Sequence, residues 1–451
     1  MVTFRRPRSK LLNDMLGVWA NGQRVGTWSI ADGDHRFTYA ENWPESAAAR
    51  PLSLSLPFTP GNTPHRGAVV KNFFDNLLPD SDAIRRRMQS KFSTSSTDTF
   101  DLLAAVGRDC VGAVQLLAPD IGPEGFDRIE ATVLDEAGVA NAINSALAAG
   151  RILGLADDEG FRVSIAGAQE KTALLWHEGQ WMRPKGATPT THIFKLPLGL
   201  VGNMRADMSS SVQNEWLCAQ LLKAMGLPVA ECTIARFGER KVLVVERFDR
   251  ALQSPPGRPA WLARLPQEDF CQVLGLPGEK KYESDGGPGI AAILRQLATS
   301  SRADADRLVF VKAQLAFWLM AATDGHAKNF SIFLERGGAF HMTPLYDVLS
   351  MWPIIGNGAS QVSARRAKLA MALRSKNAHY HLHEIRTRHW QELARQSGVP
   401  GAFDQMVGLV LQVQDALERV AAELPAGFPP QVFEPIQAGM MAQAEQFMAE
   451  L

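Results

Sequence analysis

The chain has 451 residues, with 47 lysine and arginine residues against 47 aspartate and glutamate residues, so its formal net charge is zero. This balance excludes a globally basic nucleic-acid-binding protein and an acidic solvating chain, because neither would have a net field with which to act. Hydrophobic residues make up 46% of the chain and charged residues 21%, which is typical of a globular protein with about two or three domains.

Four cysteines are widely spaced along the chain: Cys110, Cys218, Cys232 and Cys271. Because no two of them form a C-x-x-C pair, we expect neither a disulfide framework nor a structural zinc site. The longest apolar run, residues 315–322, is far shorter than the roughly 20 residues of a membrane-spanning helix. The basic start of the chain lacks the apolar core of a signal peptide, since Asn13 and Asp14 interrupt it. We therefore expect a cytoplasmic protein that does not contact a membrane.

The N-terminal part begins with strand signals. Residues 17–40 consist of short alternating segments separated by Asn-Gly and Asp-Gly dipeptides, which predicts a β-meander. Farther along, the acidic and hydroxyl residues 80–82 precede a helical run and favour the positive end of a helix. We expect residues 1–116 to form a small α+β subdomain.

Residues 117–250 are predicted to be rich in strands, and residues 251–451 to be mostly helical. An alanine-rich helix is expected within residues 131–150, and a second helix at residues 211–226 ends at Gly226 before a proline. Strand signals lie at residues 161–167, 171–176, 191–197, 233–237 and 241–248.

Asp324 and Asn329 are separated by four residues in the segment ATDGHAKNFS. Protein kinases use this spacing in their catalytic loop, where the aspartate accepts the substrate's hydroxyl proton and the asparagine ligates Mg²⁺. The pattern also suits a polar helix end with Gly325 as its cap. A second aspartate, Asp347 in TPLYDVLS, fits the kinase residue that holds the metal ions, and as an isolated residue it also suits a helix N-cap.

Lys195 lies in the apolar segment THIFKLP, where an unpaired ammonium group would be costly to bury. We therefore expect an anionic partner for it. In a kinase this partner is the phosphates of ATP together with a glutamate of the following helix, and Glu215 in NEWLC is placed to be that glutamate. A solvated helix face is the alternative for Glu215.

A turn of small and polar residues precedes Lys171 and joins two strand-like segments: Ala166, Gly167, Ala168, Gln169 and Glu170. It is neither a GxGxxG loop nor a Walker A motif, but its backbone N–H groups can reach phosphate oxygens. Read alone, it is an ordinary hairpin. The order of small-residue turn, strand lysine, helix glutamate, Asp-x4-Asn pair and second aspartate favours a phosphotransferase of kinase architecture.

The sequence thus predicts an α+β protein with a two-lobed, protein-kinase-like fold. In this interpretation, residues 1–116 form the N-terminal β-rich extension. Residues 117–250 form the kinase N-lobe with the nucleotide-binding loop, and residues 251–451 form the helical C-lobe with the catalytic loop.

At these motifs the chain resembles the HipA-type serine/threonine kinase toxins of bacterial toxin–antitoxin systems. The matching segments are SIAGAQEKTALL, THIFKLP, NEWLC, VERFDR, LPQEDFCQVLGLP, KYESDGGPGIA, ATDGHAKNFS and TPLYDVLS, with NFFDNLLPDSDAIRRRM in the N-terminal part. The resemblance implies phosphorylation of a protein serine that depends on ATP and Mg²⁺, with Asp324 as catalytic base and with Asn329 and Asp347 as metal ligands.

The resemblance also implies contacts to ATP. Lys195 and the loop of residues 166–171 would hold phosphates, and His326 and Lys328 would lie near them. The hinge beside the adenine would consist of three residues: Glu246, Arg247 and Phe248.

The resemblance further implies that Ser164 is an autophosphorylation site whose modification inactivates the kinase. A phosphate carries a charge near −2 and would compete with ATP for the same donors, so the loop would be expelled. Without the resemblance, Ser164 reads as an outward-facing strand hydroxyl.

Residues 363–395 carry eight lysine and arginine residues against Glu384 and Glu392. Seven of these basic residues can form a local face for phosphates: Arg365, Arg366, Lys368, Arg374, Lys376, Arg386 and Arg388. A solvated helix surface is the other interpretation. HipA-type toxins bind a helix-turn-helix antitoxin, HipB, and the complex represses its operator. The resemblance therefore implies backbone contacts from Arg374 and Lys376, with the operator DNA bound mainly through the antitoxin.

The resemblance implies a PI3/4-kinase-like fold and the toxin of a type II toxin–antitoxin pair, which phosphorylates a translation factor, stalls growth and favours persistence. The family's best-known target is an aminoacyl-tRNA synthetase, the glutamyl enzyme. Two alternatives stay open, namely a nucleotide-binding pseudokinase that acts as a co-repressor and a kinase of small molecules.

Overall fold

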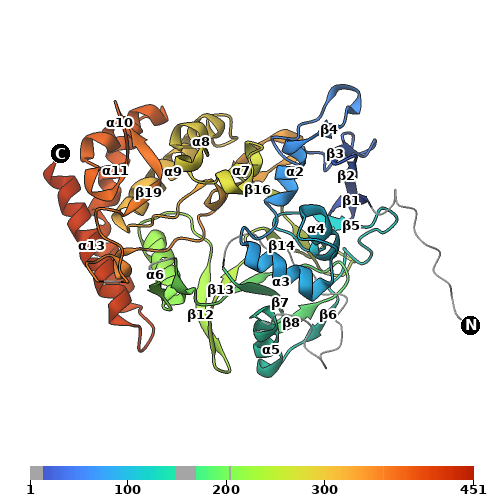
Figure 1. Ribbon diagram of the computed structural model, residues 1–451, viewed down its shortest axis with the longest axis horizontal. Coiled ribbons are helices and arrows are strands. Elements are labelled where there is room, and N and C mark those ends of the chain that lie inside the picture. The colour runs from blue at the N-terminus through green and yellow to red at the C-terminus, as the bar shows by residue number, and fades with distance from the viewer. Residues whose placement is uncertain (1–13, 148–168, 203–204, 359) are drawn as a thin grey trace, which may run out of the picture.

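The computed structural model describes residues 14–147, 169–202, 205–358 and 360–451. The N-terminal subdomain contains an antiparallel sheet in the order β4-β3-β2-β1-β5 (Figure 1). Its strands are β1 (Met15–Ala20), β2 (Gln23–Ala31), β3 (Asp34–Tyr39), β4 (His65–Arg66) and β5 (Gln115–Leu117). The predicted β-meander is present as β1 to β3. Both connecting dipeptides, Asn21-Gly22 and Asp32-Gly33, have positive φ at each residue, which matches the right-handed twist of a tight hairpin.

Two helices pack against this sheet, α2 (Ala68–Asp75) and α4 (Thr99–Val106), and α3 (Asp82–Phe92) packs on α4. The predicted start of α3 is correct, because the Ser81 side chain accepts a hydrogen bond from the Ile84 backbone N–H and so caps the first turn. The subdomain has its own apolar core, in which the rings of Trp28 and Phe74 are stacked with centroids 4.0 Å apart.

The middle of the chain forms a second antiparallel sheet in the order β12-β13-β9-β7-β8-β6. Its strands are β6 (Ala131–Val133), β7 (Lys171–His177), β8 (Gln180–Pro184), β9 (His192–Lys195), β12 (Cys232–Phe237) and β13 (Arg240–Glu246). Helices α5 (Glu136–Leu147) and α6 (Ser211–Ala224) pack against this sheet. The hairpin of β10 (Gly199–Val201) and β11 (Ala206–Met208) lies between β9 and α6 in the sequence. The predicted strand at residues 161–167 lies outside the described residues.

The C-terminal part contains the helices α7 (Phe270–Val273), α8 (Ile290–Leu297), α9 (Ala303–Leu319), α10 (Thr387–Ser397), α11 (Ala402–Leu411), α12 (Val413–Ala422) and α13 (Pro430–Ala449). Helices α10, α11 and α13 lie together at the end of the molecule that holds the C-terminus (Figure 1). The short 3₁₀ helices of the chain are η1 (Pro60–Asn62), η2 (Gly278–Lys280), η3 (Glu283–Asp285), η4 (Ala327–Asn329), η5 (Arg336–Gly338), η6 (Trp352–Ile354) and η7 (Leu382–Glu384).

This part also contains short antiparallel strands that the sequence did not predict: β14 (Arg250–Gln253), β15 (Trp261–Arg264), β16 (Gln267–Asp269), β17 (Ser331–Leu334), β18 (Phe340–Met342), β19 (Lys368–Arg374) and β20 (Ala378–His381). The helical interpretation of the basic segment is wrong for β19 and β20. Leucine, alanine and methionine in residues 369–373 favour a helix, but all five residues are buried in a strand, where tertiary packing overrides local preference.

A buried network of charged residues joins the three parts of the chain. Its members are Asp109, Arg247, Asp249, Arg250 and Arg264. Asp109 comes from the N-terminal subdomain and lies 2.9 Å from Arg250 and 3.2 Å from Arg264. Because removing one partner of a buried ion pair costs about 3–5 kcal/mol, this network fixes the N-terminal subdomain against the two other parts.

Candidate active site

Lys195 lies at the end of β9 between two carboxylates. Its ammonium nitrogen is 2.5 Å from Glu215 Oε1 on α6 and 2.7 Å from Asp347 Oδ1. The side chains of Lys195 and Glu215 are 8% and 7% exposed. Burial opposes the charge of Lys195, but Asp347 and Glu215 outweigh it and hold the lysine's pKa above its usual range. The solvated alternative for Glu215 is therefore excluded, and the anionic partner expected for Lys195 is present.

Lys171 begins β7 and lies directly opposite Lys195 in the antiparallel pairing of β7 with β9. Two ammonium groups therefore face the same region of the sheet. Burial and the charge of Lys195 lower the pKa of Lys171 to about 8. An anionic ligand near the two ammonium groups would relieve this repulsion.

The Asp-x4-Asn segment follows α9 and contains the 3₁₀ helix η4. Asn329 Nδ2 donates a hydrogen bond of 2.7 Å to the backbone carbonyl of Asp324, so its Oδ1 is presented as an acceptor. The Asp324 side chain is 55% exposed and is therefore accessible to a large substrate. The interpretation of Gly325 as a simple helix cap fails, because α9 ends at Leu319 and the segment continues into a hydrogen-bonded loop.

Asp347 has a left-handed backbone, with φ of 60°, and does not begin a helix. Non-glycine residues in this region are uncommon and occur often at functional sites. Although burial opposes its charge, Lys195 and Lys171 hold the pKa of Asp347 well below its usual range. The aspartate is thus ionised, and its helix N-cap alternative is excluded.

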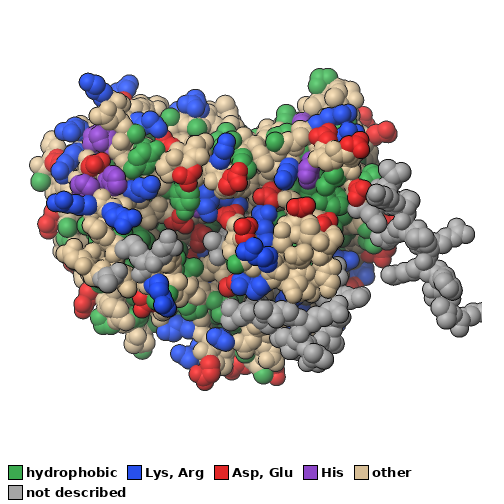
Figure 2. Space-filling model, in the orientation of Figure 1, with side chains coloured by type: hydrophobic (Ala, Val, Ile, Leu, Met, Phe, Trp, Pro, Cys, Tyr) green, Lys and Arg blue, Asp and Glu red, His purple; other side chains and the backbone are tan. Residues whose placement is uncertain are grey.

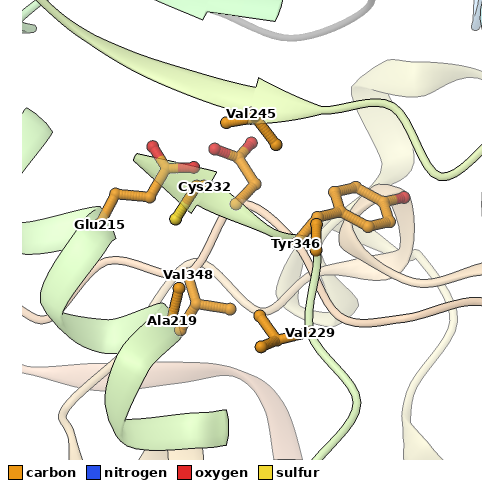
Figure 3. Close-up of a pocket in the computed structure, with 9 residues that line it drawn as sticks. Glu215, Ala219, Val229, Cys232, Val245, Tyr346 and Val348 are labelled. Atoms are coloured by element: carbon orange, nitrogen blue, oxygen red, sulfur yellow. The ribbon is translucent and has the colours of Figure 1, made fainter. Parts of the chain in front are cut away.

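Two small cavities meet at Asp347. One is lined by Asp324, Asn329 and Asp347 among others. Carboxylate and amide oxygens are the ligands that Mg²⁺ prefers, so these residues fit the predicted metal ion. The other also reaches Glu215. Figure 3 shows its apolar side, where Val229, Cys232, Val245 and Val348 surround a space next to Glu215 and Tyr346.

The predicted hinge residues differ in their surroundings. Glu246 is exposed, and its backbone N–H donates to the Glu231 carbonyl at 2.8 Å. The Phe248 ring lies 5.7 Å from the ring of Tyr346, which lines both cavities. The Arg247 side chain belongs to the buried ion network around Asp109, so it points away from the cavities and can contribute to a hinge only through its backbone.

The remaining residues that we expected near the phosphates lie in different surroundings. The His326 imidazole is 3.8 Å from the Asp324 carboxylate and packs edge-on against Tyr282. The Lys328 ammonium, by contrast, is bound by Asp80 at 2.7 Å and is 5% exposed. Lys328 therefore already has a buried partner within the chain, and a phosphate would have to compete with Asp80 for it.

The turn that we expected to bind phosphates is described only in part. Ser164, Ala166, Gly167 and Ala168 lie outside the described residues. Gln169 donates a side-chain hydrogen bond to the Leu196 carbonyl, and the Glu170 carbonyl accepts the Leu196 backbone N–H at 3.2 Å. The end of the turn is therefore joined to the strand that carries Lys195.

Two residues of the site escaped the sequence analysis. The Tyr282 hydroxyl donates a hydrogen bond to Asp324 Oδ1, and Asp80 binds both Lys281 and Lys328. Each lies in a segment that resembled the HipA family, KYESDGGPGIA and NFFDNLLPDSDAIRRRM. Only the family resemblance could have identified Tyr282 and Asp80 as site residues, because their spacing along the chain does not predict these contacts.

The basic segment of residues 363–395 is distributed over β19, β20 and α10. All seven residues of the predicted basic face are exposed, and Figure 2 shows basic and histidine side chains gathered over the region that Figure 1 labels β19 and α10. Lys376 lies in the exposed turn between the two strands. Arg374 is paired with the buried carboxylate of Glu283 at 2.5 Å, so a phosphate would have to compete with that partner.

The fold and the site have the arrangement of a kinase, in which a strand lysine meets a helix glutamate and an aspartate beside an Asp-x4-Asn loop. The chain belongs to the HipA family: the family model of the HipA-like C-terminal domain matches residues 163–426, and that of the HipA N-terminal domain matches residues 16–117. Among the described residues, every helix is too short or too polar to cross a bilayer.

Curated relatives are named as kinases. The putative kinase Y4mE of Sinorhizobium fredii is 33% identical over 420 residues, which cover 90% of this chain and 91% of the relative. The serine/threonine-protein kinase toxin HipA of Shewanella oneidensis is 28% identical over 69% of each chain. The solved structure of HipA from Shewanella oneidensis, in a complex with HipB and operator DNA, has a TM-score of 0.76 at 23% identity. It covers 96% of this chain and 97% of the solved one, and so shares the fold.

Proposed function

We propose that the chain is a serine/threonine protein kinase that acts as the toxin of a type II toxin–antitoxin module. The observation that carries the proposal is the position of Lys195, held between Glu215 and Asp347. In this proposal, the six-stranded sheet with α6 is the N-lobe and the helical part is the C-lobe of a two-lobed, PI3/4-kinase-like enzyme.

The site residues have distinct roles in the proposed reaction. Lys195 and Lys171 hold phosphate oxygens of ATP, and Asn329 and Asp347 hold Mg²⁺, which when bound neutralises phosphate charge. Asp324 takes the proton of the serine hydroxyl as the hydroxyl oxygen bonds to the γ-phosphorus. The bond from this phosphorus to the bridging oxygen breaks, and ADP leaves.

Ser164 is proposed as the site at which the kinase inactivates itself. A phosphate there would compete with the nucleotide for the lysines and backbone donors of the same site. Mass spectrometry after incubation with Mg·ATP tests this proposal. Phosphate on Ser164 would support it, and modification confined to other residues would overturn it.

The proposed partners follow from the family. The Shewanella oneidensis HipA structure contains HipB and operator DNA, and we propose a HipB-like helix-turn-helix antitoxin for this chain. Operator DNA would be bound mainly by that antitoxin, with Arg374 and Lys376 touching the DNA backbone. The proposed protein substrate is a translation factor of the aminoacyl-tRNA synthetase class, whose phosphorylation would stop growth and favour persistence.

Incubation of the purified chain with cell lysate and ATP labelled in the γ-phosphate tests the proposed class of acceptor. We expect label on protein serine or threonine in the presence of Mg²⁺, and none with the Lys195→Met variant. Label only in a soluble metabolite would identify a kinase of small molecules. Nucleotide binding without any transfer, in the presence and absence of the antitoxin, would identify a pseudokinase.

A further inference from the structure

Asp80 lies in the loop between α2 and α3 of the N-terminal subdomain and reaches the catalytic loop. Its Oδ1 is 2.7 Å from Lys328 Nζ, and its Oδ2 is 2.8 Å from Lys281 Nζ. The three side chains are between 5% and 19% exposed, so water screens these ion pairs only weakly. A single carboxylate therefore joins two segments of the C-terminal part.

Both lysines belong to segments that hold the catalytic residues. Lys328 is adjacent to Asn329, and its backbone carbonyl accepts a hydrogen bond of 2.8 Å from the Tyr346 hydroxyl. The backbone carbonyl of Lys281 accepts the Ala327 N–H at 3.1 Å. The next residue along, Tyr282, donates to Asp324. A shift of either lysine would thus move the groups that orient Asp324 and Asn329.

The loop that carries Asp80 is itself fixed to the C-terminal part. Asn72 and Asn76 on one side donate to the carbonyls of Gly275 and Leu276, at 2.8 and 2.9 Å. The contact is also closely packed, because a Cβ added at Gly278 would lie 3.0 Å from Asn76 Oδ1 and 3.4 Å from Lys328 Nζ. The acid is therefore held in place rather than free to follow the lysines.

The charges of this cluster depend on each other. Burial opposes the ionisation of Asp80, but Lys328 and Lys281 outweigh it and lower the pKa of Asp80 to about 2. Without the carboxylate, the Lys328 ammonium would stay buried beside the catalytic loop with one partner fewer. A buried charge that loses a partner moves toward water, and the loop would have to move with it.

We propose that Asp80 is a positioning residue of the catalytic loop, so that the N-terminal subdomain is part of the catalytic unit. The catalytic part of this inference rests on the proposed kinase function. The structural part, that Asp80 holds residues 324–329 in place, does not depend on it.

The test compares the full-length chain with Asp80→Asn, Lys328→Met and the double variant, and with Asp34→Asn as the control. Asp34 binds Arg36 at 3.1 Å within the N-terminal subdomain, so its loss also weakens a part-buried ion pair in that subdomain. The first measurement is native-state hydrogen exchange of peptides that span residues 323–332. The second is the kcat and KM of phosphate transfer.

We expect Asp80→Asn to speed exchange in residues 323–332 by about tenfold or more, and Asp34→Asn to leave it unchanged. Asp80→Asn should lower kcat by a similar factor with little change in the KM for ATP. Because Asp80 and Lys328 act on each other, the effects of the two single variants should not multiply in full in the double variant, where the further effect beyond Lys328→Met comes from the lost Asp80–Lys281 pair.

Unchanged exchange in Asp80→Asn, or effects of Asp80→Asn and Lys328→Met that multiply in the double variant, would overturn the proposal. If the wild-type chain transfers no phosphate, the kinase function fails, and the exchange data still decide whether Asp80 holds the loop. If the wild type is active and Asp80→Asn is equally active, the kinase function stands and the positioning role of Asp80 is refuted.

Discussion

Lys171 and Lys195 face each other across the paired strands β7 and β9. Their environments differ, because Lys195 is bound by two carboxylates whereas burial and the charge of Lys195 lower the pKa of Lys171 to about 8. One lysine of the site is thus always charged, and the other loses its proton just above neutral pH. Phosphate binding at this site should therefore depend on pH.

We predict that the affinity for Mg·ATP is steady below pH about 8 and falls by about tenfold per pH unit above it, because a phosphate site favours the protonated lysine. Binding of a non-hydrolysable ATP analogue, followed between about pH 6.5 and 9.5, measures this dependence. In Lys171→Arg the charge persists, so the decline should move to higher pH. Identical pH profiles of the wild type and Lys171→Arg would contradict the role of Lys171.

Glu215→Gln should lower phosphate transfer by about tenfold to a hundredfold, because a neutral amide orients Lys195 less firmly than a carboxylate does. The control is Glu231→Gln, which removes an exposed ion pair with Lys223 on the same helix. Such surface pairs contribute at most about 1 kcal/mol to stability, so this control should keep its activity. Steady-state rates of phosphate transfer from labelled ATP are measured for both variants. If Glu215→Gln is as active as Glu231→Gln, Glu215 has no role in the reaction.

The buried carboxyl group of Glu268 should make the stability of the protein depend on pH. This carboxyl group lies between the N-terminal subdomain and β17, accepts hydrogen bonds from Ser53 Oγ and the Leu54 N–H, and has a pKa that burial raises to about 8. The folded state therefore keeps a proton that the unfolded chain releases near pH 4.5. Between these values the unfolded state binds fewer protons, so the free energy of unfolding contributed by this group falls as pH rises.

In Glu268→Gln, the pH dependence that Glu268 gives to the free energy of unfolding should disappear, because the amide resembles the protonated acid. Relative to the wild type, the variant should gain up to about 1.4 kcal/mol of stability per pH unit between about pH 6.5 and 8. Asp269, whose pKa burial raises to about 6, titrates mostly below this window. Urea unfolding at several pH values measures the difference, with the exposed Glu45→Gln as control. A constant difference across the window would show that Glu268 is ionised in the folded protein.

The parts of the molecule that local rules govern could be predicted from the sequence. The β-meander followed from its two turn dipeptides, and the start of α3 from its capping serine. The Lys195 partner could also be expected, because an ammonium group in an apolar strand requires an anion. In each case the physical reason lies within a few residues of the feature, or in a cost that burial imposes.

The contacts that could not be predicted join distant segments. Asp80 binds lysines 201 and 248 residues away, and Tyr282 binds a residue 42 positions away. The strand β19 was missed because its residues individually favour a helix and are buried on both faces, so no alternation marks them as a strand. The position of Lys328 in the motif likewise does not predict that Asp80 of the N-terminal subdomain binds it.

The proposed kinase function depends most directly on Asp324 as the base that accepts the substrate proton. Glutamine is the replacement of choice, since an asparagine before Gly325 would be prone to deamidation back to aspartate. We predict that Asp324→Gln loses about 10²–10⁴-fold of its phosphate transfer from labelled ATP, while its thermal stability and its affinity for Mg·ATP stay close to those of the wild type. Transfer at the wild-type rate by a folded Asp324→Gln variant would contradict the assignment of this site.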